Sequence, residues 1–277
     1  MTIAEAIRDA AKRLAGASDT ARLDAELLMA HALGMERSQM LLRAMPDPVP
    51  VGFAKMVERR ARHEPVAYIT GKTEFFGLEL AVAPGVLIPR GDSETLIEAA
   101  REAFAGREPP KEILDLGTGS GALLLAALSL FPGASGVATD ASAEILPAFA
   151  RNVEAHAAGR TAVSFVQADW RERGWSGAIT PVDLILCNPP YVEDDAALDR
   201  QVRDWEPASA LFAGPEGLDD YRILIPQLRA LMNAGAVAIL EIGASQAQAV
   251  GELAEKAGFA TRLRHDLANR PRALVLS

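Results

Sequence analysis

The sequence predicts an α/β protein: a doubly wound, mostly parallel sheet of seven strands, with a small all-helical domain in front of it. Two observations carry this prediction. From about residue 92 onward, short apolar runs alternate with helical segments, which is typical of parallel strands joined by crossover helices. Up to residue 72, apolar residues recur at the three- and four-residue spacing of amphipathic helices. A hairpin-like segment lies between, so we expect three parts: residues 1–72, 73–90 and 91–277.

The composition is that of a globular chain and limits the possible partners. The 277 residues are 49% hydrophobic and 23% charged, which suits one large or two modest domains. A single cysteine, Cys187, excludes a disulfide framework, and with only four scattered histidines no metal site is expected. The first helix is charged and amphipathic rather than a signal peptide, so a cytoplasmic protein with no membrane partner is expected.

The chain has a net charge of −9 and a pI near 5.1. This balance argues against a duplex-DNA binder, whose affinity depends on neutralising phosphates, so no direct nucleic-acid partner is expected. The excess of acidic residues lies in the part of the chain after residue 72. It is either the ordinary surface charge of an acidic cytosolic protein or a complement to a basic macromolecular partner.

The first 43 residues carry the helical apolar spacing, and the proline-rich loop 45–50 interrupts it. A further helix is expected over residues 51–63. Its three arginines are expected on a solvated face: Arg59, Arg60 and Arg62.

The connector 73–90 contains aromatic and β-branched residues with Gly77 and Pro84-Gly85 as turn signals, which predicts a β-hairpin. A helix should follow over 93–104. The uncharged stretch 116–139 is long enough for a membrane span, but its glycines divide it into a strand, a loop, a helix and a strand. The expected parallel strands are 112–117, 136–140, 163–169, 183–188 and 236–243. At the end of the chain, two short strands leave no room for a crossover helix, so an antiparallel hairpin should close the sheet.

A glycine-rich loop, DLGTGSGA (115–122), lies where the first strand of this sheet meets its first helix. Open α/β sheets bind ligands at such carboxyl strand ends, and glycines let a ligand approach the backbone. The pattern is ambiguous by itself, because Gly117, Gly119 and Ala122 also match a dinucleotide fingerprint. Asp140 ends the next strand, where a carboxylate can accept bonds from both hydroxyls of a ribose. We therefore expect a ligand that contains adenosine, with a surface acid as the alternative for Asp140.

Two acids favour S-adenosylmethionine over a dinucleotide. Asp115 precedes the first glycine, where it could help bind an amino group but would sit poorly beside a pyrophosphate. Asp169 and Trp170 follow the third strand, where an acid and a flat ring could line an adenine slot. A purely structural role in the core is the alternative for Trp170.

The sequence Asn188-Pro189-Pro190-Tyr191 ends a strand in an unusual way. Both prolines lack a backbone N–H and fix φ near −65°, and each restricts the residue before it to extended conformations. The segment is therefore stiff and rich in acceptors: the Asn188 side-chain oxygen and a backbone carbonyl can hold the two hydrogens of one –NH2 group. Tyr191 offers a ring for stacking against a planar amide or base. Holding both hydrogens would favour pyramidalisation of an amide nitrogen and aim its lone pair at a sulfonium methyl. A rigid proline turn is the structural alternative.

These motifs together resemble the peptide chain release factor glutamine methyltransferases, over nearly the full length. The resemblance rests on the segments ARLDAELLMAHALG (21–34), EPVAYITGKTEFFGLELAVAPGVLIPR (64–90), DLGTGSGA, ADW (168–170), NPPY, WEPASAL (205–211), LEIG (240–243) and DLANRPR (266–272). It implies a class I, Rossmann-like methyltransferase fold and methylation of the glutamine side chain in the Gly-Gly-Gln loop of release factors, in support of translation termination. It further implies that the N-terminal domain recognises the release factor.

The resemblance also implies roles for single residues. S-adenosylmethionine, which becomes S-adenosylhomocysteine, is expected to be bound by Gly117, Thr118, Gly119, Ser120, Gly121, Asp140, Trp170 and Asn188. The substrate glutamine is expected at Asn188, Pro189, Pro190 and Tyr191, with Asn188 and Pro189 as the catalytic positions. One departure stands in LIPRGDSE (87–94): Gly91 replaces the family's proline and Ser93 its threonine. A looser joint between hairpin and domain is expected there.

Four alternatives remain open on the sequence. The nearest is a glutamine methyltransferase of a ribosomal protein. An adenine-N6 methyltransferase would hold a flipped base in the same acceptor site. This alternative is disfavoured because the chain has no separate basic recognition domain. A non-catalytic S-adenosylmethionine-binding module and an NAD-dependent oxidoreductase complete the set.

Overall fold

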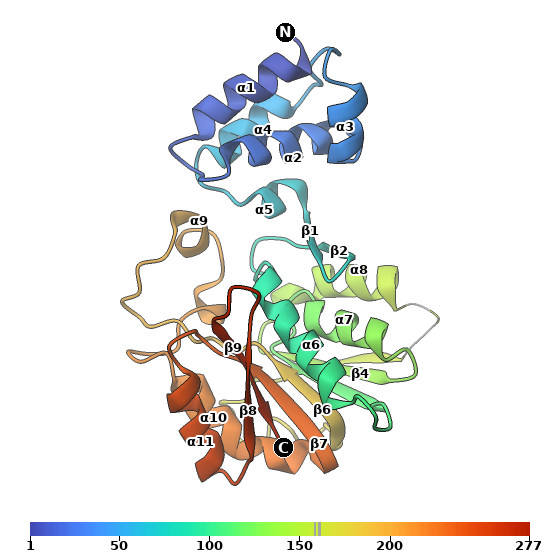
Figure 1. Cartoon of the computed structure of the whole chain (residues 1–277), viewed down its shortest axis with the longest axis vertical. Helices are drawn as coiled ribbons and strands as arrows, with labels where there is room; N and C mark the ends of the chain where they lie inside the picture. Colours follow the sequence, from blue (N-terminus) through green and yellow to red (C-terminus); the bar gives the residue numbers. More distant parts are fainter. Residues whose placement is uncertain (158, 160–161) are drawn as a thin grey trace. The chain divides into compact units, whose positions relative to one another are not determined.

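Residues 1–157, 159 and 162–277 are described by a computed structural model of the chain, and they form two units. One unit comprises Met1–Lys72 with Leu198–Glu206, and the other comprises Thr73–Ala197 with Pro207–Ser277. Figure 1 shows helices alone in the first unit and a helix-covered sheet in the second.

The first unit is helical, as the sequence predicts. Its helices are α1 (Ile3–Leu14), α2 (Ala21–Leu33), α3 (Arg37–Arg43), α4 (Phe53–Arg60), α5 (Val66–Thr70) and α9 (Arg200–Arg203). A capping box starts α1: the Thr2 hydroxyl accepts from the Glu5 main chain, and the Glu5 carboxylate accepts from the Thr2 N–H. One apolar cluster joins α1 to α5, with Ile7, Leu28 and Phe53 among its buried members.

The prediction of a solvated arginine face is wrong for Arg60. Its side chain is only 3% exposed, and its Nε donates to Asp24 Oδ2 of α2 at 2.6 Å. The reason lies in the helical period, since Phe53, Val57 and Arg60 share the buried face of α4. A buried guanidinium is tolerated there because a buried carboxylate pairs with it.

The second unit begins with the predicted hairpin, β1 (Lys72–Phe75) and β2 (Leu78–Ala81). The two residues between the strands, Phe76 and Gly77, have φ of 51° and 76°. Positive φ at both central positions is the type I′ geometry that suits two-residue hairpins.

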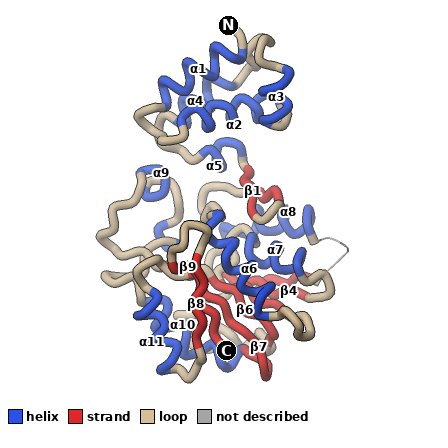
Figure 2. The backbone as a smooth tube through the Cα atoms, in the orientation of Figure 1, coloured by secondary structure: helices blue, strands red, loops and turns tan. Residues whose placement is uncertain are grey.

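The main sheet has seven strands in the order β5-β4-β3-β6-β7-β9-β8, and the strands are red in Figure 2. They are β3 (Glu112–Leu116), β4 (Ser135–Asp140), β5 (Val163–Gln167), β6 (Val182–Cys187), β7 (Met232–Glu241), β8 (Thr261–His265) and β9 (Pro271–Leu276). The pairs among β3 to β7 are parallel, and β9 is antiparallel to both neighbours, β7 and β8. The sequence prediction of a mostly parallel sheet closed by an antiparallel hairpin is therefore confirmed.

Helices cover both faces of this sheet (Figure 1). They are α6 (Glu94–Ala103), α7 (Ala122–Leu130) and α8 (Leu146–His156) on one face, and α10 (Asp219–Leu228) and α11 (Ala247–Lys256) on the other. Short 3₁₀ turns η1 (Gly91–Ser93), η2 (Ala143–Ile145), η3 (Ala208–Ala210) and η4 (Arg229–Leu231) complete the unit. The uncharged stretch 116–139 is the β3–α7–β4 segment, and within the described ranges no helix has the length and hydropathy needed to cross a bilayer.

The order of the strands reverses between β3 and β6, which pair in parallel with Leu116 opposite Cys187. Gly117 and Asn188 are the next residues of the two strands, so the glycine loop and the NPPY turn leave the sheet side by side. Ligands of doubly wound sheets bind at such a point.

Asn152 of α8 ties the hairpin to the glycine loop. Its side chain is 2% exposed. The side-chain Oδ1 accepts from the Ala81 N–H at 2.6 Å, and Nδ2 donates to the carbonyls of Ala81 and Ser120 at 3.0 and 2.8 Å. One buried amide thus satisfies three main-chain groups of two separate segments.

We predict that Asn152→Ala lowers the free energy of unfolding by about 1–3 kcal/mol, because it leaves buried main-chain groups without partners. Urea denaturation measures the loss. The matched control is Asn233→Ala, which removes an exposed asparagine bonded to Asp183 and should change stability by about 0.5 kcal/mol or less. Equal effects of the two substitutions would contradict the role of Asn152.

Candidate active site

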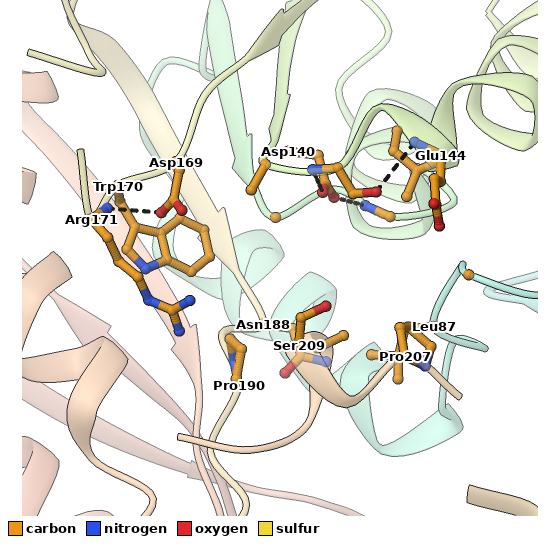
Figure 3. Close-up of a pocket in the computed structure, with 17 residues that line it drawn as sticks. Leu87, Asp140, Glu144, Asp169, Trp170, Arg171, Asn188, Pro190, Pro207 and Ser209 are labelled. Carbon is orange, nitrogen blue, oxygen red and sulfur yellow. Dashed lines mark hydrogen bonds between the residues drawn. The ribbon is translucent and has the colours of Figure 1, made fainter. Parts of the chain in front are cut away.

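A cleft opens at the carboxyl ends of β3, β4 and β6 (Figure 3). The predicted site residues that line it are Gly117, Gly119, Asp140, Asp169, Trp170, Asn188 and Pro190. Thr118, Ser120 and Gly121 are buried behind the two lining glycines. Pro189 and Tyr191 are close by in the turn but are not part of the lining.

The glycine loop is folded so that its main chain faces the cleft. Gly117 has φ of 71°, and a Cβ atom placed on it would stand 3.2 Å from the Trp170 ring. Both the backbone angle and the close ring therefore require glycine at this position. The Thr118 N–H donates to the Thr139 carbonyl at 2.8 Å, which joins the loop to the end of β4.

Asp140 is held in place by the backbone on both of its oxygens. Oδ2 accepts from the Gly119 N–H and Oδ1 from the Ser142 N–H, each at 2.9 Å. Burial raises the pKa of the Asp140 carboxyl above its ordinary value, and these backbone hydrogen bonds oppose the rise. Each carboxylate oxygen can accept more than one bond, so the group can bind a ligand hydroxyl in addition.

Asp115 lies under the loop and does not line the cleft. It is 1% exposed, and its Oδ2 accepts from the Thr118 hydroxyl at 2.7 Å and from the Leu124 N–H at 3.3 Å. Within the described residues its Oδ1 is buried without a hydrogen-bond partner. Burial raises the pKa of Asp115 to about 7, against those two hydrogen bonds. The expectation that it binds a ligand amino group stays a prediction.

Trp170 forms one wall of the cleft and is fixed by a buried acid. Its Nε1 donates to Asp220 Oδ1 at 2.7 Å, while the far edge of the ring faces Gly117. Arg171, the next residue, donates to both oxygens of Asp220 at 2.8–2.9 Å. Asp220 is fully buried at the start of α10. Sequence reasoning missed Asp220, and no local motif marks it.

The NPPY turn keeps its predicted acceptors free. Within the described part of the chain, neither the Asn188 side chain nor the Pro189 carbonyl takes part in a hydrogen bond. Asn188 and Pro190 face the cleft in Figure 3. Tyr191 turns its hydroxyl away, toward the core, where it donates to Glu241 Oε1 at 3.1 Å.

Several lining residues were not predicted from the sequence. They come from the connector (Gly85, Leu87), from the turn after β4 (Ala141, Ser142, Glu144, Ile145), from the residue after Trp170 (Arg171) and from the segment around η3 (Pro207, Ser209, Ala210). The connector and η3 segments carry sequence resemblance but no chemistry-bearing side chain that would have pointed to the cleft.

Two family models match the chain. One described as the PrmC N-terminal domain covers residues 5–71, and one described as a methyltransferase small domain covers residues 92–204. The chain is 40% identical to the release factor glutamine methyltransferase of Cereibacter sphaeroides, over 94% of this chain and 92% of that protein. It is 38% identical to the protein of the same name from Moorella thermoacetica, over 93% and 91%.

Solved structures are also similar. A methyltransferase from Pyrococcus furiosus has a TM-score of 0.51 at 17% identity and covers 73% of this chain and 89% of its own, which supports the fold. A release-factor-specific protein-(glutamine-N5) methyltransferase from Alicyclobacillus acidocaldarius has a TM-score of 0.41 at 28% identity, over 70% and 96%.

We predict a pH-dependent stability difference that depends on Asp115. Because its pKa is raised from 3.8 to about 7, the folded protein holds a proton that the unfolded chain has released. The contribution of Asp115 is therefore fully present below about pH 4 and is lost as the pH rises toward 7. Urea denaturation of the wild type and of Asp115→Asn should show the wild-type free energy of unfolding falling by at least about 1 kcal/mol more than that of the variant over this range. Parallel pH profiles would contradict the shift.

Proposed function

The chain belongs to the family of release factor glutamine methyltransferases, and we propose that its cleft transfers a methyl group from S-adenosylmethionine to the glutamine side-chain nitrogen in the Gly-Gly-Gln loop of a peptide chain release factor. The observation that carries the proposal is the pairing of β3 with β6. It puts a loop suited to an adenosine ligand directly beside a turn suited to an –NH2 group. This adjacency supports transfer of a group from one ligand to the other.

The residues of the cleft fit the methyl donor. Asp140 offers a carboxylate to the ribose hydroxyls, Gly117 and Gly119 allow close approach, and Trp170 provides a flat wall for the adenine. S-adenosylmethionine, when bound, supplies a methyl group on an electron-poor sulfur. A buried acid behind Trp170 keeps this wall at a fixed distance from the loop.

The turn after β6 fits the methyl acceptor. The Asn188 side-chain oxygen and the Pro189 carbonyl are unused acceptors on a stiff backbone, and together they can take both hydrogens of the glutamine amide. An amide nitrogen is a poor nucleophile because its lone pair is delocalised into the carbonyl. Holding both hydrogens favours pyramidalisation and fixes the direction of the lone pair. Positioning of this kind can lower a barrier by about 7–11 kcal/mol. No side chain has to remove the proton first, because it can leave after transfer.

We assign Tyr191 and Pro190 to the substrate side of the cleft as well. Pro190 lines it, and the half-buried Tyr191 ring stands at the far end of the turn. The helical unit is proposed to recognise the release factor. Because release factors act in translation, the reaction is proposed to take place in the cytoplasm.

Labelled S-adenosylmethionine tests the proposal. The protein is incubated separately with purified release factors, ribosomal proteins and DNA, and the labelled product is digested and sequenced by mass spectrometry. The label should appear on the glutamine of the Gly-Gly-Gln loop. Label on a ribosomal protein alone, or on adenine alone, would replace the proposed substrate by that alternative.

We predict that Asp140→Ala weakens S-adenosylmethionine binding by about 1.5–3 kcal/mol, the range for hydrogen bonds to a charged group. Isothermal titration measures the change. The matched control is Asp183→Ala at the opposite end of the sheet, where the carboxylate also accepts from two backbone N–H groups, of Lys111 and Glu112. The control should bind the cofactor as the wild type does. Unchanged affinity in Asp140→Ala would remove Asp140 from the ribose role.

For Asn188→Ala we predict a fall in kcat of about 100-fold or more, corresponding to about 2.7 kcal/mol, because one of two oxygens holding the –NH2 group is gone. Cofactor affinity should barely change, since the glycine loop and Asp140 remain. Tyr191→Phe keeps the ring and should be much milder. Near-normal turnover in Asn188→Ala, or a defect confined to cofactor binding, would refute the role of the amide acceptor.

A further inference from the structure

A buried carboxylate stands behind the NPPY turn and takes no part in the cleft. Glu241 is the last residue of β7 and is 1% exposed. Since Cys187 of β6 pairs with Leu240, Glu241 lies beside the first residue of the turn. Its Oε1 accepts the Tyr191 hydroxyl at 3.1 Å.

Glu241 is held from several directions. The Tyr221 hydroxyl of α10 donates to its main-chain carbonyl at 2.7 Å. The Ile242 N–H donates to the Arg272 carbonyl at 2.8 Å, which ties the end of β7 to β9. Burial raises the pKa of the Glu241 carboxyl, and the hydrogen bond from the Tyr191 hydroxyl opposes the rise. Within the described residues the other oxygen, Oε2, is buried without a hydrogen-bond partner. Glu241 is therefore held through one carboxylate oxygen and through its main chain.

A contribution to the stability of the fold does not explain a buried carboxylate at this position. A buried carboxylate loses its hydration, and an apolar residue of similar size commonly stabilises a core as well or better. Leu240 and Ile242 on either side are fully buried in apolar clusters. Glu241 contacts the NPPY turn through the hydroxyl of Tyr191.

Tyr191 is also held at its main chain. Gln246 Nε2 donates to the Tyr191 carbonyl at 3.0 Å, and its Oε1 accepts from Gly243 at 2.9 Å. The last residue of β7 thus holds the Tyr191 hydroxyl, and the segment that follows β7 holds its carbonyl. Because φ is fixed at Pro189 and Pro190, the turn has fewer torsion angles that can absorb a shift of Tyr191 before it reaches Asn188.

We propose that Glu241 is a positioning residue for methyl transfer: by accepting the Tyr191 hydroxyl it fixes the NPPY turn and so the direction of the Asn188 acceptor. This role rests on the proposed function of the cleft. Glu241 touches neither cofactor nor substrate and acts through Tyr191.

A double-mutant cycle on kcat tests the proposal with release factor as substrate. Tyr191→Phe and Glu241→Leu should each lower kcat about tenfold, and the double variant should also lose about tenfold rather than about 100-fold, because both remove the same bond. Glu241→Gln retains a carbonyl acceptor and should stay within about threefold of the wild type. Cofactor affinity should be unchanged in all four proteins.

Additive losses, an equal loss in Glu241→Gln and Glu241→Leu, or losses that follow cofactor affinity would overturn the positioning role. Glu241→Gln and Tyr191→Phe nearly conserve volume, so the comparison of their kcat values with their melting temperatures decides the question if Glu241→Leu does not fold. The wild-type reaction, measured first, tests the proposed function separately. If the wild type methylates the release factor but the losses in the cycle are additive, only the role of Glu241 is refuted. If the wild type does not methylate the release factor, the proposed function and the role of Glu241 are both overturned.

Discussion

The parallel pairing of β3 with β6 is the constraint on which the rest of the site depends. These strands stand at the point where the sheet order reverses, and Leu116 lies opposite Cys187. The next residues are Gly117 and Asn188, so the register sets the glycine loop beside the NPPY turn. A shift by one residue would turn the side chains of one strand to the opposite face and move the glycine loop away from the NPPY turn.

Buried polar groups behind the cleft hold its walls and the turn beside it. Asn152 holds the glycine loop to the hairpin, Asp220 holds Trp170, and Glu241 holds Tyr191. All three are nearly or fully buried, and none lines the cleft. Hydrogen bonds in a buried, low-dielectric environment are stronger than in water, so each of them restricts the movement of the group that it holds. Residues outside the cleft therefore determine its shape, while Asn188 on its surface keeps an unused hydrogen-bond acceptor.

The sequence predicted the parts of this arrangement that follow local rules. Alternating apolar runs predicted the sheet, and the motifs around Gly117, Asp140 and Asn188 are brought to one cleft as expected. The prediction for Arg60 was wrong because the helical pattern was misread: its spacing from Phe53 already placed it on the buried face of α4. The residues behind the cleft could not be predicted, because their partners are distant along the chain: 71 residues separate Asn152 from Ala81, and 50 separate Tyr191 from Glu241. Only the tertiary fold brings them together.

The central claim is that the NPPY turn binds both hydrogens of the substrate amide, and NMR can observe those hydrogens directly. A release factor with ¹⁵N in its glutamine side chains is bound to the protein together with S-adenosylhomocysteine, which cannot donate a methyl group. The account predicts that both side-chain N–H protons of the Gly-Gly-Gln glutamine shift and exchange more slowly with water in the complex, because each donates to a protein oxygen. Free-state shifts and exchange rates for both protons in a saturated complex would contradict it.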